Sequence, residues 1–251
     1  MTKKIWITGA SSGIGKALAI KFSKEGWQVA ASARRENLLQ ELNKNNSNIH
    51  SFPLDVKNES ETKKVFQDIL KKFQTVAICV FCTGIHDPES EKKLSSEKIR
   101  EIMETNFFGT VNCIMAVNAY FRERKNGHIS IVSSVAGYRG LPAASGYCAS
   151  KAALISLAES LFFDFKRYNV RISLVSPGFI KTPLTDKNKF PMPMIKSPEF
   201  AAEKMFTGLT KKNAFEIHFP MAFTMIMKLL KIMPNWLYFL LVKKGMKTIN
   251  Y

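Results

Sequence analysis

Tyr147 and Lys151 stand four residues apart, and Ser134 precedes the tyrosine by thirteen residues. Apolar residues recur at helical spacing through residues 147–168, which predicts a helix there. Positions i and i+4 share one face of a helix, so the phenol and the ammonium are expected to be neighbours. A nearby positive charge favours the phenolate and would lower the pKa of Tyr147 from about 10 toward the working pH. Such a tyrosine can donate and recover a proton, as a general acid and base does.

A glycine-rich turn follows the first apolar segment of the chain. The segment Ile5-Trp6-Ile7 leads into Gly9, Gly13 and Gly15, and a helical pattern begins directly afterwards. Glycines in a strand-to-helix turn let the backbone approach a pyrophosphate, and the amides at the helix start stabilise its charge. A Tyr and a Lys at helical spacing also occur by chance, so it is the combination with this turn that indicates an active site.

Seven apolar segments of strand length alternate with helical patterns. They are Lys4–Thr8, Gln28–Ala33, Asn48–Leu54, Val76–Cys82, His128–Ser133, Val170–Val175 and Phe215–Phe219. Strands separated by crossover helices predict a parallel sheet with helices on both faces, a doubly wound α/β fold. Ligands of such folds bind at the carboxyl ends of the strands. Gly9, Asp55, Gly84, Ser134 and Pro177 all fall at those ends.

Length and composition favour one large core. With 251 residues, 46% of them hydrophobic, the chain can form a single α/β domain. We expect a catalytic domain over residues 1–220 and a helical extension over 221–251 that packs on the same domain. Lys3 and Lys4 lead into a short apolar strand without a signal-peptide pattern, and the cysteines are scattered. Both features predict a cytoplasmic location.

Metal and nucleic-acid sites are not indicated. Cys79 and Cys82 are three residues apart within a predicted strand, where they would point to opposite faces, so a buried strand is favoured over a redox pair. The four histidines show no metal-ligand spacing, and we predict no metal. The net charge is +17, but the lysines are spread along the chain, which favours a solvated basic surface over specific nucleic-acid binding.

Together these motifs resemble the short-chain dehydrogenase/reductase family, in its compact branch, over roughly residues 3–219. The residues that carry the resemblance are Gly9, Gly13, Gly15, Asp55, Val56, Asn106, Ser134, Tyr147, Lys151, Ser176, Pro177 and Gly178. The resemblance implies a Rossmann-type fold of about seven strands and hydride transfer between a nicotinamide and a carbonyl or alcohol carbon. It also implies a homodimer or homotetramer, assembled through the long helices that carry Asn106 and Tyr147.

The resemblance assigns a catalytic role to each of four residues. Tyr147 would be the proton donor or acceptor, and Lys151 would bind the nicotinamide ribose and lower the tyrosine pKa. Ser134 would hold the substrate oxygen together with Tyr147, and strand alternation favours it over Ser133. Asn106, which we expect inside a long helix, would hold a water that links Lys151 to solvent.

The end of the second strand indicates the cofactor. Proteins of this fold that prefer NAD usually place a carboxylate there, whereas this chain has Ala33 followed by Arg34 and Arg35. Two arginines suit a 2′-phosphate, so we predict NADP(H). Arg34 matches the position that the family uses, while Arg35 can also be interpreted as a cap on a solvated surface. The other predicted cofactor contacts are Gly9, Ser11, Ser12, Gly13, Ile14, Gly15, Asp55, Val56, Cys82, Thr83, Gly84, Tyr147, Lys151, Pro177, Gly178, Ile180 and Thr182.

One segment departs from the family pattern. Cys82-Thr83-Gly84 stands where the family commonly has Asn-Ala-Gly. Gly84 still allows close backbone approach to the cofactor. The missing asparagine would remove a hydrogen bond between strands, which affects local rigidity more than chemistry.

The stretch from Phe219 to Val242 is apolar but is interrupted by two lysines and Pro234. Neither half reaches the ~20 apolar residues of a membrane span, so two short amphipathic helices are predicted. They could cover the substrate cleft or a subunit interface, which we favour. The alternative is peripheral contact with the inner face of a membrane, with Trp236, Tyr238 and Phe239 at the interface and lysines facing anionic lipid.

The sequence thus predicts an NADP(H)-dependent oxidoreductase. The soft apolar segment Phe190–Ile195 favours an apolar ketone, aldehyde or alcohol as the substrate. The alternative is a protein of the same fold that binds NADP(H) without turnover, as a sensor or a membrane-associated scaffold.

Overall fold

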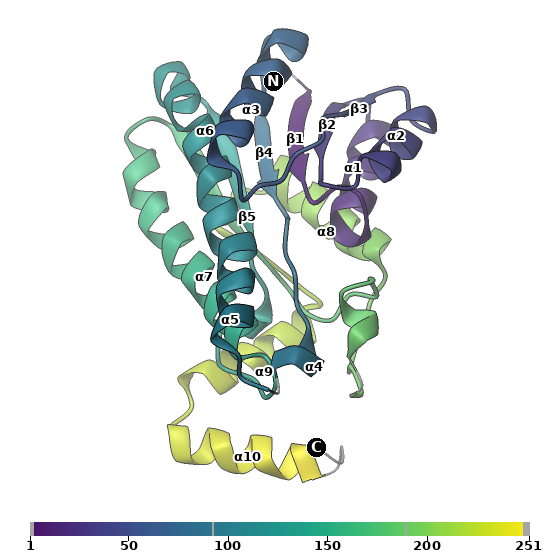
Figure 1. Ribbon diagram of the computed structural model, residues 1–251. Coiled ribbons are helices and arrows are strands. Elements are labelled where there is room, and N and C mark those ends of the chain that lie inside the picture. Colours follow the sequence, from purple (N-terminus) through teal and green to yellow (C-terminus); the bar gives the residue numbers. More distant parts are fainter. Residues whose placement is uncertain (1–2, 92, 189, 248–251) are drawn as a thin grey trace.

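The computed structural model describes residues 3–91, 93–188 and 190–247. Within these residues seven strands form one parallel sheet in the order β3-β2-β1-β4-β5-β6-β7 (Figure 1). The strands are β1 (Lys4–Thr8), β2 (Gln28–Ser32), β3 (Ile49–Ser51), β4 (Ile78–Phe81), β5 (Gly127–Val132), β6 (Val170–Pro177) and β7 (Glu216–Phe219). The predicted doubly wound fold is confirmed, and the strand order reverses between β1 and β4, where ligands of such sheets bind.

The predicted strands are right in position and differ by a few residues at their ends. The largest difference is at Asn48–Leu54, of which only Ile49–Ser51 forms β3. This strand lies at the edge of the sheet, and the amides of Phe52 and Leu54 still donate hydrogen bonds to Ala31 and Ala33 beyond its end. Pro53 between them is tolerated because the other side of an edge strand has no partner. The central strands end level with one another, since Thr8 pairs with both Ser32 and Phe81.

Helices cover both faces of the sheet. They are α1 (Gly13–Lys24), α2 (Glu36–Lys44), α3 (Glu59–Phe73), α4 (Pro88–Glu91), α5 (Ser96–Met103), α6 (Gly109–Arg124), α7 (Ser145–Lys166), α8 (Pro198–Thr210), α9 (Met221–Ile232) and α10 (Asn235–Lys247). Three short turns join them, a π-helical turn η1 (Glu104–Phe108) and the 3-10 turns η2 (Val135–Gly137) and η3 (Thr185–Lys187). The predicted helix over 147–168 corresponds to α7, shifted by two residues.

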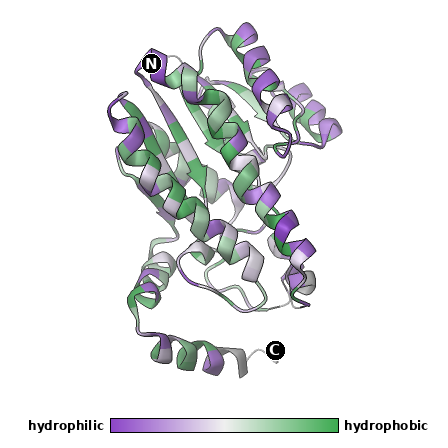
Figure 2. Ribbon diagram, turned by 60° about the vertical axis from the view of Figure 1, so that its left-hand side comes forward, coloured by the Kyte–Doolittle hydropathy of each residue, from purple (hydrophilic) through white to green (hydrophobic). Residues whose placement is uncertain are grey.

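Alternating side chains of the strands fill two apolar layers. Trp6 of β1 packs with α3, α6 and α7, whereas its neighbours Ile5 and Ile7 pack with α1, α2 and α8. Cys79 and Cys82 likewise belong to opposite layers, as strand alternation predicts. Figure 2 shows the hydrophobic strands between helices in which hydrophilic and hydrophobic residues alternate. The two layers hold the strand ends rigidly where the predicted site residues lie.

Two helices end the described chain, as predicted, with Pro234 between them. α9 packs beside β7, and α10 lies at the periphery of the molecule, attached by a hydrogen bond from Tyr238 to the carbonyl of Gly140 (Figure 1). Among the described residues no helix combines the length and the apolar character that a bilayer crossing requires.

Candidate active site

A cavity of about 680 Å³ opens at the carboxyl ends of the strands. Every residue assigned to the cofactor or to the substrate oxygen, Asn106 excepted, lies in its wall, from Gly9 in the first turn to Thr182 after β6. The segment Phe190–Ile195, expected to shape the substrate site, does not line it. Asn106 itself does not line the cavity, but the neighbouring residue Thr105 does. A volume of this size suits an extended ligand together with a smaller one.

The glycine turn forms a close-fitting cradle. Gly9 has a φ of +70°, and an added Cβ there would lie 2.9 Å from the carbonyl oxygen of Cys82. A Cβ on Gly15 would lie 2.3 Å from the carbonyl oxygen of Gly9, so neither position accepts a side chain. α1 begins at Gly13 without a side-chain cap, which leaves its first amides available to an anion. The turn therefore fits the pyrophosphate of a dinucleotide.

Arg35 extends from the end of β2 back to this turn. Its guanidinium donates hydrogen bonds to the hydroxyl of Ser11 at 2.9 Å and to that of Ser12 at 2.7 Å. Arg34 is exposed and also lies in the cavity wall. Arg35 does precede α2 as its N-cap residue, but it is more than a cap on a solvated surface, because its charge is fixed beside the turn that would hold phosphates.

The first two turns of α7 place Tyr147 and Lys151 on one face, as the spacing predicts. The Lys151 Nζ lies 5.7 Å from the centre of the Tyr147 ring and donates a hydrogen bond of 3.0 Å to the carbonyl of Val132. Ser134 also lines the cavity, and its side chain acts on the Tyr147 hydroxyl to lower the tyrosine pKa. A Cβ on Gly84 would lie 3.4 Å from the Nζ, so the glycine leaves the ammonium open to the cavity.

The predicted lowering of the tyrosine pKa is wrong. Burial raises the pKa of Tyr147 to about 12, although the Ser134 side chain lowers it. Burial also lowers the pKa of Lys151 to about 8. The spacing argument counted only the neighbouring charge and neglected desolvation, which disfavours the charged form of both groups. Tyr147 is therefore a protonated phenol at neutral pH, ready to donate.

Sequence comparison decides the family. A sequence model of the short chain dehydrogenases matches residues 3–191. The chain belongs to this family of oxidoreductases. The resemblance on which the site residues were chosen is thereby confirmed.

Relatives of this short-chain dehydrogenase cover most of its length. An uncharacterized oxidoreductase of Myxococcus xanthus is 34% identical over 236 residues, 92% of this chain and 93% of that one. A 3-oxoacyl-(acyl-carrier-protein) reductase of Thermotoga maritima is 32% identical over 185 residues, 72% of this chain and 75% of that one. Among solved structures, ElxO with NADP bound has a TM-score of 0.76 and is 25% identical, with coverage of 87% and 98%. A short-chain dehydrogenase from Streptomyces avermitilis, 23% identical, has a TM-score of 0.78 with coverage of 91% and 92%, which supports the fold alone.

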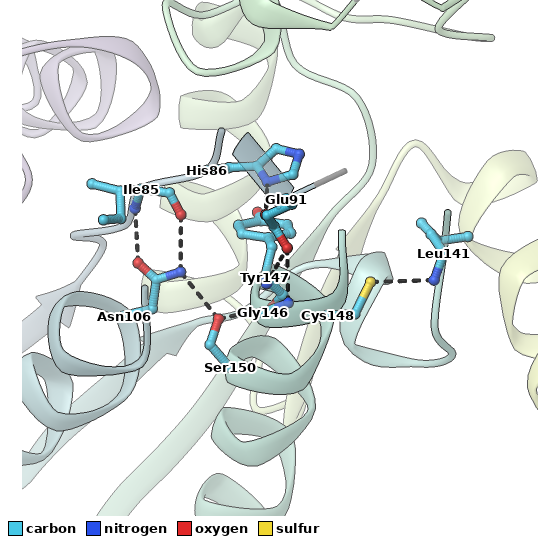
Figure 3. Close-up of polar contacts among 9 residues, drawn as sticks. All are labelled: Ile85, His86, Glu91, Asn106, Leu141, Gly146, Tyr147, Cys148 and Ser150. Carbon is cyan, nitrogen blue, oxygen red and sulfur yellow. Dashed lines mark hydrogen bonds and ion pairs between the residues drawn. The ribbon is translucent and has the colours of Figure 1, made fainter. Parts of the chain in front are cut away.

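Asn106 of the short-chain dehydrogenase lies in the π-helical turn η1 between α5 and α6, not in a regular helix. Its amide oxygen accepts a hydrogen bond of 2.7 Å from the amide of Ile85, and its amide nitrogen donates to the Ile85 carbonyl and to the hydroxyl of Ser150, both at 3.0 Å (Figure 3). The π-turn directs this side chain inward. Asn106 thereby ties the segment after β4 to α7, while its role in a proton relay stays a prediction.

The end of β4 is held by a contact that the sequence did not reveal. The Cys82 amide donates a hydrogen bond of 3.2 Å to the hydroxyl of Thr8 at the end of β1. The two strands are therefore linked although the family's asparagine is missing at this position.

Two buried residues that sequence reasoning missed, His86 and Glu91, contact Tyr147. The Nδ1 of His86 lies 2.7 Å from a carboxylate oxygen of Glu91, and the His86 ring lies 4.5 Å from the Tyr147 ring between centres. The other Glu91 oxygen accepts hydrogen bonds from the amides of Gly146 and Tyr147, at 2.8 and 3.1 Å (Figure 3). Glu91 thus caps the start of α7, where no local side chain does so. His86 also lines the cavity beside Tyr147.

Glu91→Gln is expected to shift the kinetic pKa of the proton donor downward. The Glu91 charge raises the pKa of Tyr147, so its removal lowers that pKa and moves the alkaline limb of the pH–rate profile to lower pH. The weaker cap should also cost about 1–2 kcal/mol of stability. A pH–rate profile and chemical denaturation measure the two effects. Glu97→Gln, in the first turn of α5, is the control and should move neither.

Proposed function

We propose that this short-chain dehydrogenase is an NADP(H)-dependent oxidoreductase that acts on a carbonyl or alcohol group of an apolar small molecule. One observation carries the proposal, namely that a single cavity is lined both by the uncapped glycine turn with its arginines and by Ser134, Tyr147 and Lys151. Bound NADPH would supply the hydride for a carbonyl carbon. Substrate binding and proton transfer would be carried out by side chains of the protein.

These side chains divide the work of proton transfer and binding. Ser134 and Tyr147 both line the cavity, so a substrate oxygen held by both would receive its proton from the phenol. Lys151 presents its ammonium beside Gly84, where it can bind a ribose hydroxyl and stabilise the phenolate that remains. Asn106 fixes the segment after β4 that forms this side of the cavity. In alcohol oxidation the same groups act in reverse.

The preference for NADP(H) rests on charge at the end of β2. Ala33 offers no carboxylate that would repel a 2′-phosphate, and both Arg34 and Arg35 lie in the cavity wall. Because Arg35 is already held by Ser11 and Ser12, little side-chain entropy is lost when it binds an anion.

Titration with NADPH and separately with NADH, followed by fluorescence, tests this preference. Each of Arg34→Ala and Arg35→Ala is expected to weaken NADPH binding roughly 10- to 100-fold, because a charge-assisted hydrogen bond contributes about 1.5–3 kcal/mol. NADH binding should change by less than about threefold, since NADH has no 2′-phosphate. Arg167→Ala, at the far end of α7, is the control. Equal binding of both cofactors by the wild type would overturn the preference.

An apolar substrate is favoured by aromatic rings beside the cavity. Phe179 lies between two residues of the cavity wall, Gly178 and Ile180, and its ring lies 6.0 Å from that of Phe190 and 5.3 Å from that of Phe223. A panel of apolar ketones and aldehydes with NADPH, followed by absorbance, tests the activity. Consumption of NADPH supports an enzyme, whereas tight binding without turnover by any panel member supports the alternative of a sensor.

A homodimer is part of the proposal. Two exposed aromatic side chains of α7, Phe162 and Phe163, and the exposed Phe108 and Met115 around the start of α6 form apolar surfaces on the two helices expected to meet a partner. Burial of such side chains between two copies would be favourable.

A further inference from the structure

α9 turns a continuous apolar face away from the protein. Its inner side buries Thr224 and Met227. Its outer side exposes five large apolar side chains at helical spacing, Met221, Met225, Ile226, Leu229 and Ile232, the last of them 78% exposed. Single exposed apolar residues are ordinary, but an uninterrupted face on one helix indicates a surface that binds something apolar.

α10 continues this pattern with a mixed face. Trp236, Phe239, Leu240 and Lys243 share its outer side by their spacing, and the Trp236 side chain is 69% exposed. The opposite side is anchored through Tyr238, which is buried and donates a hydrogen bond to the carbonyl of Gly140. The expectation that Tyr238 lies at a membrane interface is therefore wrong, because its ring faces the protein. α10 is therefore held in a fixed orientation that presents aromatic rings and a lysine together.

The charge of this region selects the partner. Residues 221–251 contain five lysines and no aspartate or glutamate. Lys228 is paired with Glu216 of β7, whereas Lys231 and Lys243 are exposed beside the apolar faces. A second copy docked through the same surface would bring these lysines against one another, because a twofold interface is self-complementary. An anionic lipid surface supplies the missing negative charge, and it accommodates tryptophan and phenylalanine at the level of its headgroups.

We infer that α9 and α10 form a docking surface for membranes that contain anionic lipid. The helices would lie in the plane of the headgroups with the apolar side chains of both outer faces inserted. This agrees with the finding that no described helix can span a bilayer. Lys228 forms an ion pair of 2.6 Å with Glu216 of β7, so α9 stays attached to the sheet while its outer face is free to insert.

The docking surface adjoins the mouth of the active site. Phe223 of α9 contacts Phe179 beside the cavity, and a Cβ on Gly178 would lie 2.7 Å from the Phe223 ring. Arg139, five residues after Ser134, donates hydrogen bonds to the carbonyls of Leu230 and Met233 at the end of α9. A docked protein would thus open its cavity close to the bilayer. This consequence rests on the proposed function and assigns lipid-soluble carbonyl compounds or alcohols as substrates, whereas the docking itself does not depend on turnover.

Co-flotation with vesicles tests the docking. The full chain should bind vesicles of phosphatidylcholine mixed with phosphatidylglycerol, at least tenfold more strongly than phosphatidylcholine alone, and added salt should weaken binding. Lys243→Gln with Lys244→Gln should weaken binding roughly 25-fold, a factor of about five for each lysine near an anionic surface. Trp236→Ser with Phe239→Ser should weaken it at least tenfold.

Matched variants keep this test independent of folding and of activity. Lys24→Gln with Lys44→Gln removes two exposed lysines at the ends of α1 and α2 and should leave binding unchanged. Reduction of a water-soluble ketone should be unaffected in every variant, so loss of vesicle binding with normal turnover isolates the docking surface. Absence of wild-type flotation, or equal flotation of the Trp236 and Phe239 double variant, would overturn the inference. The inference would also be wrong if the wild type does not bind vesicles but forms an oligomer that dissociates in the double variant.

Discussion

Tyr147→Phe is expected to lower turnover about 10³-fold, within the range that positioned general acids contribute. The variant keeps the ring against His86 but lacks the only proton that the phenol can donate to a substrate oxygen. Affinity for NADPH should stay within about twofold, because the phenol is assigned to the substrate and not to the phosphates. Pre-steady-state reduction of a panel ketone measures the first quantity, and fluorescence titration the second.

Tyr168→Phe is the matched control for this substitution. Tyr168 follows the other end of α7, far along the helix from the cavity, and its ring lies 4.8 Å from the guanidinium of Arg122. Loss of its hydroxyl should leave turnover unchanged. Normal turnover in Tyr147→Phe would remove the tyrosine from the mechanism and assign proton donation to another group of the cavity.

The parts of the site that lie within one local segment could be predicted from the sequence. The glycine turn is such a part, since a short apolar strand, three glycines and a helical pattern follow one another within residues 4–24. The pairing of Tyr147 with Lys151 is another, because helical spacing alone places both on one face. The sheet followed from the alternation of apolar segments with helices.

The parts that depend on contacts between distant segments could not be predicted. Glu91 caps α7 from 55 residues away, and nothing in the spacing of Glu91 and Gly146 indicates it. Arg35 reaches Ser11 only because α2 begins at Glu36 and directs the preceding side chain toward the glycine turn. The prediction of a lowered pKa for Tyr147 failed for a related reason, because the phenol is desolvated by all the parts of the chain that surround it.

Lys151→Met is expected to impair function and to stabilise the protein at neutral pH. Loss of the ammonium removes a charge-assisted contact to the cofactor, which should weaken NADPH binding roughly 10- to 100-fold. Burial lowers the pKa of Lys151 from 10.5 to about 8, so below that pH the folded state holds a poorly solvated charge at a cost of roughly 3 kcal/mol. The variant also loses the hydrogen bond from Lys151 to the Val132 carbonyl, which costs about 1 kcal/mol of stability. The expected net stabilisation is therefore roughly 2 kcal/mol.

The pH dependence of stability separates this effect from ordinary repacking. Between pH 8 and 10.5 the unfolded chain binds more protons at Lys151 than the folded one does, so wild-type stability should rise through this window relative to Lys151→Met. Chemical denaturation at pH 7 and again near pH 10.5 measures stability at the two ends of this pH window. The variant should be more stable than the wild type at pH 7 and should lose this difference near pH 10.5. Lys166→Met, exposed at the end of α7, should change stability by less than about 0.5 kcal/mol at both. A destabilised Lys151→Met at pH 7 would show that the ammonium supports the fold, whereas the expected gain would show that the protein retains a costly buried charge for its chemistry.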